Sequence, residues 1–170
     1  DFARYLNIHS ALMPALSPDG SRVAFLTDIT GNFQVWSASA APTPADPWPR
    51  QLTFFPDKVW ELYAAPQTGR LLAVSDSGGN ERQQFYLISN FGGCGHDIRR
   101  LTTNDDAIHT FGAWSKDGQQ ILYTSNARNN IDFDIYRMDL RTGEARMVCE
   151  CAGNRSIGAW LEGGRYALSA

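Results

Sequence analysis

The segment Ser77–Arg82 carries the residues whose types and spacing best suit chemistry with a ligand. It reads Ser-Gly-Gly-Asn-Glu-Arg, so an acidic and a basic residue stand side by side after two glycines and an asparagine. Glycine permits close approach of the backbone, and opposite charges can bind polar or charged groups. The candidate contacts are Asn80, Glu81 and Arg82, with Arg128 as a further candidate. The alternative interpretation is a solvated loop with one surface ion pair, which contributes little.

No catalytic residue is predicted in this chain. The nucleophile motif Gly-x-Ser-x-Gly is absent, because the glycine before Ser156 stands one position too far away. The three histidines, His9, His96 and His109, are scattered, and no pattern pairs any of them with a nucleophile and a carboxylate. Each is predicted to be a surface or hydrogen-bonded loop histidine.

Metal binding and cofactors are not predicted either. Asparagines and aspartates gather at Asn129–Asp134, but the central Gly and final Glu of a calcium loop are missing. Cys149-Glu150-Cys151 lacks a second ligand pair for zinc, so half-buried thiols at a strand end are the preferred interpretation. Three cysteines do not suit a complete disulfide framework, and a reducing, cytoplasmic location is expected.

The elements that must position these residues are short strands. The segment Ala113–Val148 predicts four of them: one ending at Trp114, then Gln119–Ser125, Asp134–Leu140 and Ala145–Val148. Asp and Gly in the joining segments are typical of tight hairpin turns. The result is a four-stranded antiparallel meander.

The same unit recurs along the chain with a nearly constant period. The turn glycines Gly20, Gly69 and Gly118 lie 49 residues apart, and the aromatic residues Trp36, Tyr86 and Tyr136 lie 50 apart. A further copy begins at Gly158-Ala159-Trp160. A period of this length with four strands per repeat is typical of a β-propeller, in which each sheet buries its faces against its neighbours.

The predicted fold is therefore all-β, a propeller of four-stranded antiparallel blades with about three and a half blades in this chain. We expect small residues on the first strand of each blade and the main apolar content on the second. Residues 1–11 are assigned to a lead-in segment and 12–170 to the partial propeller domain. Its blades are expected at about 12–53, 54–102, 103–150 and, incomplete, 151–170.

The net charge and the hydropathy of the chain bear on two classes of partner, nucleic acids and membranes. The net charge is −3, and no Lys/Arg cluster marks a nucleic-acid surface. No apolar run approaches the length of about 20 residues that a membrane helix needs. We expect neither nucleic acid nor membrane as a partner.

Five segments, taken together, carry a family resemblance. They are Tyr5–Ile8, Ser17–Gly20, Trp48–Thr53, Gly78–Gln84 and Asp106–His109. In this order they resemble the N-terminal propeller of the prolyl oligopeptidase family of serine peptidases, above all its acylaminoacyl-peptidase-like bacterial members. The Ser-Pro-Asp-Gly element alone is shared with TolB-type propellers.

The resemblance implies a propeller that lies as a lid over an α/β-hydrolase domain, which carries the Ser-Asp-His triad and is not in this chain. The expected partners are that domain, the remaining blades and a short peptide substrate. In this setting Glu81 would meet a free amino terminus and Arg82 a carboxylate or backbone carbonyl, with Arg128 as the second candidate. The alternative is a non-enzymatic TolB-like propeller that binds a protein partner.

Overall fold

A computed structural model describes residues 9–92, 97–161, 163 and 165–169 of the 170-residue chain. Most of the predicted lead-in segment, as well as Cys94 and His96, lies outside these residues. All regular structure in the described ranges is β-strand, without an α-helix. The described residues accordingly contain no helix long and apolar enough to cross a membrane.

In the described ranges, fourteen strands form three four-stranded sheets and one two-stranded sheet. The first sheet contains β1 (Ala11–Leu16), β2 (Arg22–Thr27), β3 (Gln34–Ser39) and β4 (Arg50–Gln51). The second contains β5 (Val59–Ala64), β6 (Leu71–Ser75), β7 (Gln84–Ile88) and β8 (Ile98–Arg100). The third contains β9 (His109–Trp114), β10 (Gln120–Ser125), β11 (Asp134–Asp139) and β12 (Ala145–Cys149). The last contains β13 (Ser156–Trp160) and β14 (Tyr166–Ser169).

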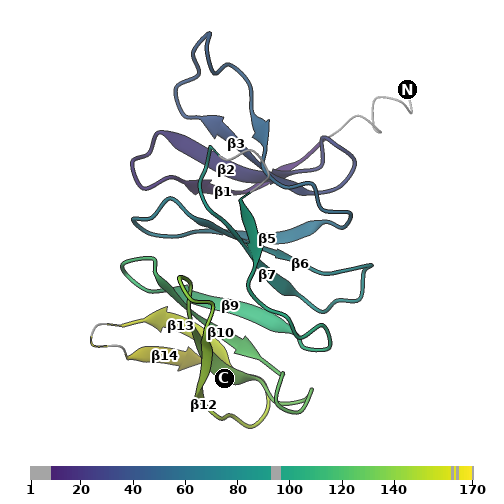
Figure 1. The fold of residues 1–170 in the computed structure, drawn as a ribbon, viewed down its shortest axis with the longest axis vertical. Helices are drawn as coiled ribbons and strands as arrows, with labels where there is room; N and C mark the ends of the chain where they lie inside the picture. The colour runs from purple at the N-terminus through teal and green to yellow at the C-terminus, as the bar shows by residue number, and fades with distance from the viewer. Residues whose placement is uncertain (1–8, 93–96, 162, 164, 170) are drawn as a thin grey trace.

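Each sheet is an antiparallel meander in which strands adjacent in sequence are hydrogen-bonded neighbours. The first three sheets follow one another along the long axis of the molecule in chain order, and the two-stranded sheet packs against the third (Figure 1). The predicted all-β propeller, with three complete blades and half of a fourth among the described residues, is confirmed. We number these sheets blade one to blade four.

The apolar run of β6 shows why the second strands carry apolar residues on both faces. Successive side chains of a strand point to opposite faces. Leu71 and Ala73 belong to a core shared with blade one, whereas Leu72 and Val74 belong to a core shared with blade three. A blade with a neighbour on each side therefore buries both faces of its middle strand, and all five residues of β6 are buried.

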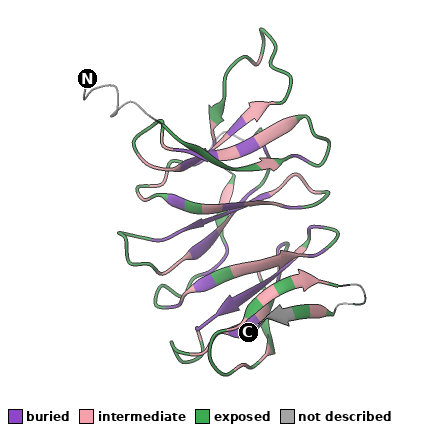
Figure 2. Ribbon diagram, turned by 180° about the vertical axis from the view of Figure 1, so that it is seen from behind, coloured by how far each residue is buried: buried purple, intermediate pink, exposed green. Residues whose placement is uncertain are grey.

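Blade one has a described neighbour on one side only, and its burial reflects this. Five of the six residues of β1 are exposed, and β2 alternates between half-buried and buried positions. Figure 2 shows the buried positions concentrated on the middle strands inside the stack.

A buried polar side chain at the start of each third strand holds the link to the next blade. Gln34 donates through Nε2 to the carbonyls of Phe55 and Asp57, both at 3.1 Å. Gln84, at the equivalent position, donates to the carbonyls of Asn104 and Ala107 at 3.0 and 3.2 Å. These bonds satisfy backbone carbonyls in the links, which lack strand partners there.

The predicted hairpin turns depend on glycine for two separate reasons. Gly69 and Gly118 have the same left-handed φ of 66°, which an L side chain adopts only at a cost. A Cβ atom added to Gly69 meets no atom within 4 Å, but one added to Gly118 would lie 2.4 Å from the carbonyl oxygen of Pro66 in blade two. Gly118 therefore also permits contact between blades.

We predict that Gly118→Ala destabilises the protein more than Gly69→Ala. Both substitutions incur about 1 kcal/mol for the left-handed backbone, and overpacking against Pro66 adds about 2 kcal/mol for Gly118→Ala alone. Denaturant unfolding of both variants of the full-length protein measures this difference. Equal losses of unfolding free energy in the two variants would show that the first hairpins of blades two and three can move apart to accommodate the added methyl group.

His109 lies in the core, so its predicted place on the surface or in a hydrogen-bonded loop is wrong. It begins β9, is 5% exposed and packs between the rings of Phe85 and Tyr123. Neither ring nitrogen has a hydrogen-bond partner among the described residues. Burial lowers the pKa of His109 to about 4, although the backbone of Asn104 acts in the opposite direction.

This depressed pKa predicts a loss of stability in mild acid. His109 is neutral when folded, whereas the unfolded chain takes up the proton near pH 6.5. Its contribution is thus complete above pH 6.5 and is lost as the pH falls towards about 4, with a maximum loss of about 3 kcal/mol.

Urea unfolding across this pH range, compared between the wild type and His109→Phe, measures the effect. Phenylalanine preserves the aromatic packing and removes the titration, so the variant should lose less stability on acidification. Identical pH profiles would contradict the prediction.

Candidate functional site

The candidate site lies where the loop between β6 and β7 meets the first strands of blades two and three. A cavity of about 540 Å³ opens there, lined by Trp60, Asn80, Glu81, Arg82, Gln83 and Ile108. A smaller cavity of about 190 Å³ adjoins it, lined by Trp60, Glu61, Gln83, His109 and Thr110. The structure thus brings Asn80, Glu81 and Arg82 together, and it adds Trp60 to them.

Asp76 holds this site in place through two hydrogen bonds. It follows β6 directly, is 5% exposed, and accepts hydrogen bonds from Trp60 Nε1 at 2.8 Å and from the Glu81 amide at 2.9 Å. Burial alone would raise its pKa, but these two hydrogen bonds hold the pKa of Asp76 below its ordinary value. One ionised carboxylate therefore fixes both the indole and the loop.

The loop itself is held by further short-range contacts. The Asn80 side chain accepts a hydrogen bond from the Arg82 amide at 2.9 Å, and the Gly78 amide donates to Asp57 Oδ2 at 2.8 Å. Gln84 Nε2 donates to the Arg82 carbonyl at 3.2 Å. Glu81 has a φ of 58°, an unfavourable conformation for a residue with a side chain. The loop conformation is thus determined by its partners.

The surface ion pair of the alternative interpretation does not form between Glu81 and Arg82. Among the described residues, neither charged side chain has an ion-pair or hydrogen-bond partner. Glu81 has a left-handed backbone, and the side chains of Glu81 and Arg82 both line the cavity. Two unpaired opposite charges are therefore available to a polar ligand.

Trp60 gives the cavity an aromatic wall. Its side chain is 40% exposed although it belongs to a strand, and the ammonium group of Lys58 lies 3.3 Å from the ring centroid. This is a close cation–π contact. An aromatic surface beside separate acidic and basic groups can bind a short chain that carries both apolar and charged groups.

Arg128 is placed elsewhere, in a cluster of carboxylates. Its Nε lies 2.7 Å from Asp134 Oδ2, and it also contacts Asp132 and Glu150 at 3.4 Å each. The hydrogen bond with Asp134 raises the pKa of Arg128 and lowers the pKa of Asp134. Arg128 does not line the cavity beside Glu81 in the described part of the chain. Its contacts tie blade three to the following link.

The same cluster bears on the calcium alternative at Asn129–Asp134. Asp132 and Asp134 both accept from the Arg128 guanidinium, so a cation of the protein already meets these carboxylates. Over the described ranges, no three His, Cys, Asp or Glu side chains gather as a metal-binding group.

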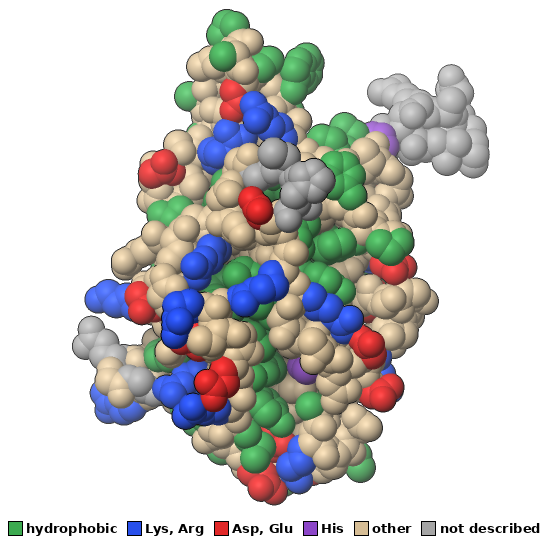
Figure 3. All heavy atoms as spheres, in the orientation of Figure 1, with side chains coloured by type: hydrophobic (Ala, Val, Ile, Leu, Met, Phe, Trp, Pro, Cys, Tyr) green, Lys and Arg blue, Asp and Glu red, His purple; other side chains and the backbone are tan. Residues whose placement is uncertain are grey.

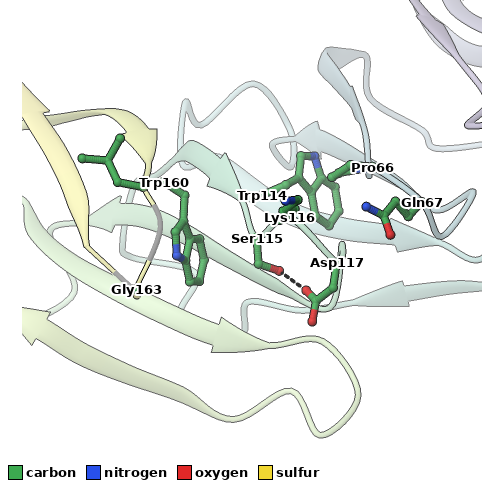
Figure 4. A pocket seen from close by; sticks show the side chains of 9 residues that line it. Pro66, Gln67, Trp114, Ser115, Lys116, Asp117, Trp160 and Gly163 are labelled. Carbon is green, nitrogen blue, oxygen red and sulfur yellow. Dashed lines mark hydrogen bonds between the residues drawn. The ribbon is translucent and has the colours of Figure 1, made fainter.

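A second cavity lies at the opposite end of the sheets and has a volume of about 700 Å³. First-hairpin turns of three successive blades line it, including Pro66, Ser115 and Gly163. The rings of Trp114 and Trp160 come from β9 and β13, and the hydrogen bond from Ser115 to Asp117 closes the turn beside them (Figure 4). None of the site residues predicted from the sequence lines this cavity.

Trp60 and Asp76 were missed as site residues, although the repeat contains a signal for Asp76. A polar residue follows the second strand of every complete blade: Asp28, Asp76 and Asn126. Asp28 accepts from the Ser10 amide at 2.9 Å, and Asn126 from the Ile108 amide at 2.8 Å. In blade two this position binds Trp60 and Glu81 instead.

We predict that Asp76→Ala loosens the site and lowers stability. Two hydrogen bonds to a buried carboxylate are lost, which corresponds to about 3 kcal/mol. Asp76→Asn keeps one acceptor oxygen and should lose less. Urea unfolding measures the cost, and hydrogen exchange at residues 77–82 measures the loosening. Unchanged exchange in Asp76→Ala would show that the loop does not depend on this carboxylate.

Comparison with family models finds no match, and comparison with curated proteins finds none either. Solved structures do match. TolB from Acinetobacter baumannii aligns with a TM-score of 0.63 and 18% identity, over 94% of this chain and 37% of that one. A putative TolB from Agrobacterium tumefaciens aligns with 0.61 and 22%, over 94% and 53%.

A puromycin-hydrolysing peptidase from Mycobacterium tuberculosis aligns with a TM-score of 0.57 and 14% identity, over 84% of this chain and 21% of that one. The chain thus spans about half or less of the proteins it resembles. At these identities the likeness establishes the fold: the chain has the β-propeller architecture found both in TolB proteins and in peptidases.

Proposed function

We propose that this chain is the propeller part of a serine peptidase of the prolyl oligopeptidase family, where it admits and positions short peptides. The α/β-hydrolase domain with the catalytic triad and the remaining blades would be supplied elsewhere in the same polypeptide. The peptidase among the structural neighbours supports the architecture. The resemblance of Gly78–Gln84 to that family supports the assignment.

The observation that carries the proposal is the cavity beside Trp60. It presents Glu81 and Arg82 without partners among the described residues, next to an exposed aromatic ring. Burying the charged terminus of a peptide without a partner costs several kcal/mol. Glu81 would bind an amino terminus and Arg82 a carboxylate or carbonyl, while Trp60 would pack against an apolar side chain.

A second candidate function is that of a TolB-like propeller that binds a protein partner without catalysis. The alignment of two TolB structures over 94% of the chain favours it. The complete reading frame separates the two proposals, because a peptidase requires an α/β-hydrolase domain with a Gly-x-Ser-x-Gly motif. A reading frame without this domain would overturn the peptidase proposal.

The charge distribution is consistent with a small polar ligand rather than an extended polyanion. On the face drawn in Figure 3, Asp and Glu side chains lie among the Lys and Arg side chains. The formal net charge of the chain is −3. Recognition would then depend on local pairs such as Glu81 and Arg82.

We predict that Glu81→Ala and Arg82→Ala each lower kcat/KM on short peptides by about tenfold in the full-length protein, which corresponds to about 1.4 kcal/mol. Melting temperatures should change little, because neither side chain has a partner among the described residues. Acetylating the amino terminus of the substrate should abolish the effect of Glu81→Ala and leave that of Arg82→Ala.

Glu144→Ala and Arg146→Ala are matched controls. These residues form an exposed ion pair at 2.8 Å and do not line the cavity. Their substitution should leave kinetics unchanged. Unchanged kinetics with a lowered melting temperature in the Glu81 and Arg82 variants would assign the loop to the architecture.

A further inference from the structure

Cys149 and Cys151 lie side by side where β12 ends. Their Sγ atoms are 3.6 Å apart, and both residues are half-buried free cysteines. Residues two apart on an extended chain share a face, with Cα atoms about 6.6 Å apart. The two sulfur atoms are much closer than this spacing, so the side chains converge on each other.

Both cysteines are held in place by neighbouring groups. Cys149 pairs with Ile135 in the strand ladder. The Cys151 amide donates to Asp134 Oδ1 at 2.9 Å, and its carbonyl accepts from Arg128 at 3.2 Å. The Asp134 side chain is fully buried. The approach of the thiols is therefore built into the connection between blades three and four.

The pair is better suited to sulfur chemistry than to metal binding. A structural zinc site needs four ligands, and the described residues provide no third His, Cys, Asp or Glu near enough to complete even a group of three. The nearest buried carboxylate, Asp134, is already paired with Arg128. Two thiols alone can still be oxidised to a disulfide.

We propose that Cys149 and Cys151 form a reversible dithiol–disulfide site that exchanges with a small-molecule disulfide of the glutathione type. The cysteine pair would then respond to the redox state of the compartment. This proposal is independent of the peptidase assignment.

The exchange proceeds in two steps. The Cys149 thiolate attacks one sulfur of the small disulfide, which breaks its S–S bond, forms a mixed disulfide and releases one small thiol. Cys151 then loses its proton and attacks the Cys149 sulfur, which forms the intramolecular disulfide and releases the second small thiol. Two protein thiols are oxidised, one small disulfide is reduced to two thiols, and the two protons end on those thiols.

The order of attack follows from the surroundings of the two thiols. Burial raises the pKa of the Cys151 thiol, and the neighbouring Cys149 raises it further. Cys151 is therefore the poorer first nucleophile and the better resolving group, because the mixed disulfide places its target within about 4 Å.

The resulting disulfide should be easily reduced. Disulfides span Cα separations of about 4.4–6.8 Å, and an extended Cys-x-Cys segment lies near the upper limit. Closure must bring the two Sγ atoms from 3.6 Å to about 2.05 Å while the Cys151 backbone remains bound to Asp134 and Arg128. Strained disulfides of this kind are more oxidising and are opened by excess thiol.

Tryptic peptide mapping of the full-length protein tests the proposal directly. Cleavage after Arg146 and Arg155 releases Met147–Arg155, which contains both cysteines, whereas Cys94 lies on the separate peptide Gln83–Arg99. After treatment with excess oxidised glutathione, Met147–Arg155 should lose two hydrogens and resist alkylation. Subsequent treatment with reduced glutathione should restore both thiols.

Single-serine variants test the order of the steps. Cys151→Ser should stop at the mixed disulfide on Cys149, and Cys149→Ser should react about tenfold more slowly with oxidised glutathione. Stable glutathionylation of the wild type, a disulfide from either cysteine to Cys94, or two free thiols in excess oxidised glutathione would each overturn the proposal. Tight retention of a soft monovalent metal that blocks oxidation would overturn it in favour of a metal site.

Discussion

The arrangement of the sheets depends on a buried polar contact at the start of each third strand. A chain that passes from the last strand of one blade to the first strand of the next carries backbone carbonyls that no strand can satisfy. Gln34 and Gln84 donate to these carbonyls from inside the stack. Since an unsatisfied buried carbonyl is costly, these contacts set where each blade begins, and hence where its loops open.

Blade three meets the same requirement with charge. Asp134 replaces the glutamine, accepts a hydrogen bond from the Cys151 amide and is neutralised by Arg128. A buried carboxylate needs such a partner, because an isolated charge in the interior is strongly unfavourable. The Arg128 side chain therefore stabilises the fold. The thiols of Cys149 and Cys151 lie on the connection that Arg128 and Asp134 hold in place.

Much of the fold could be predicted because its determinants are local and repeated. Hairpin glycines such as Gly69 and Gly118 and third-strand aromatics such as Tyr86 recur with the blade period, so the repeat in the sequence predicts where they stand. His109 was assigned wrongly because its burial results from Phe85 and Tyr123, which lie on other strands. The partners of Arg128 lie in blade three and just after β12, so they come together only once that blade has folded.

The candidate site could be predicted only in part, for a related reason. Ser77–Arg82 stands out in the sequence by its glycines and charges, but Trp60 and Asp76 acquire their roles through a contact across the blade. The loop occurs where the repeat is broken. The polar position after the second strand accepts from the amide just before the first strand in blades one and three, but it accepts from an indole and a loop amide in blade two.

This exchange of partners leaves a residue with a strained backbone, Glu81, in the loop of blade two. In blade two the acid holds the first strand through the Trp60 side chain and not through a backbone amide, and it supports a left-handed Glu81 whose side chain has no partner in the described part of the chain. Strained backbone persists where surrounding contacts over-determine it, and such positions cluster at binding sites. Glycine adopts a left-handed backbone without strain, as it does at the two positions before Asn80. Glycine at position 81 would therefore be more favourable for stability than glutamate. The glutamate there keeps its left-handed backbone through the hydrogen bond from its amide to Asp76, and its side chain lines the cavity beside Trp60.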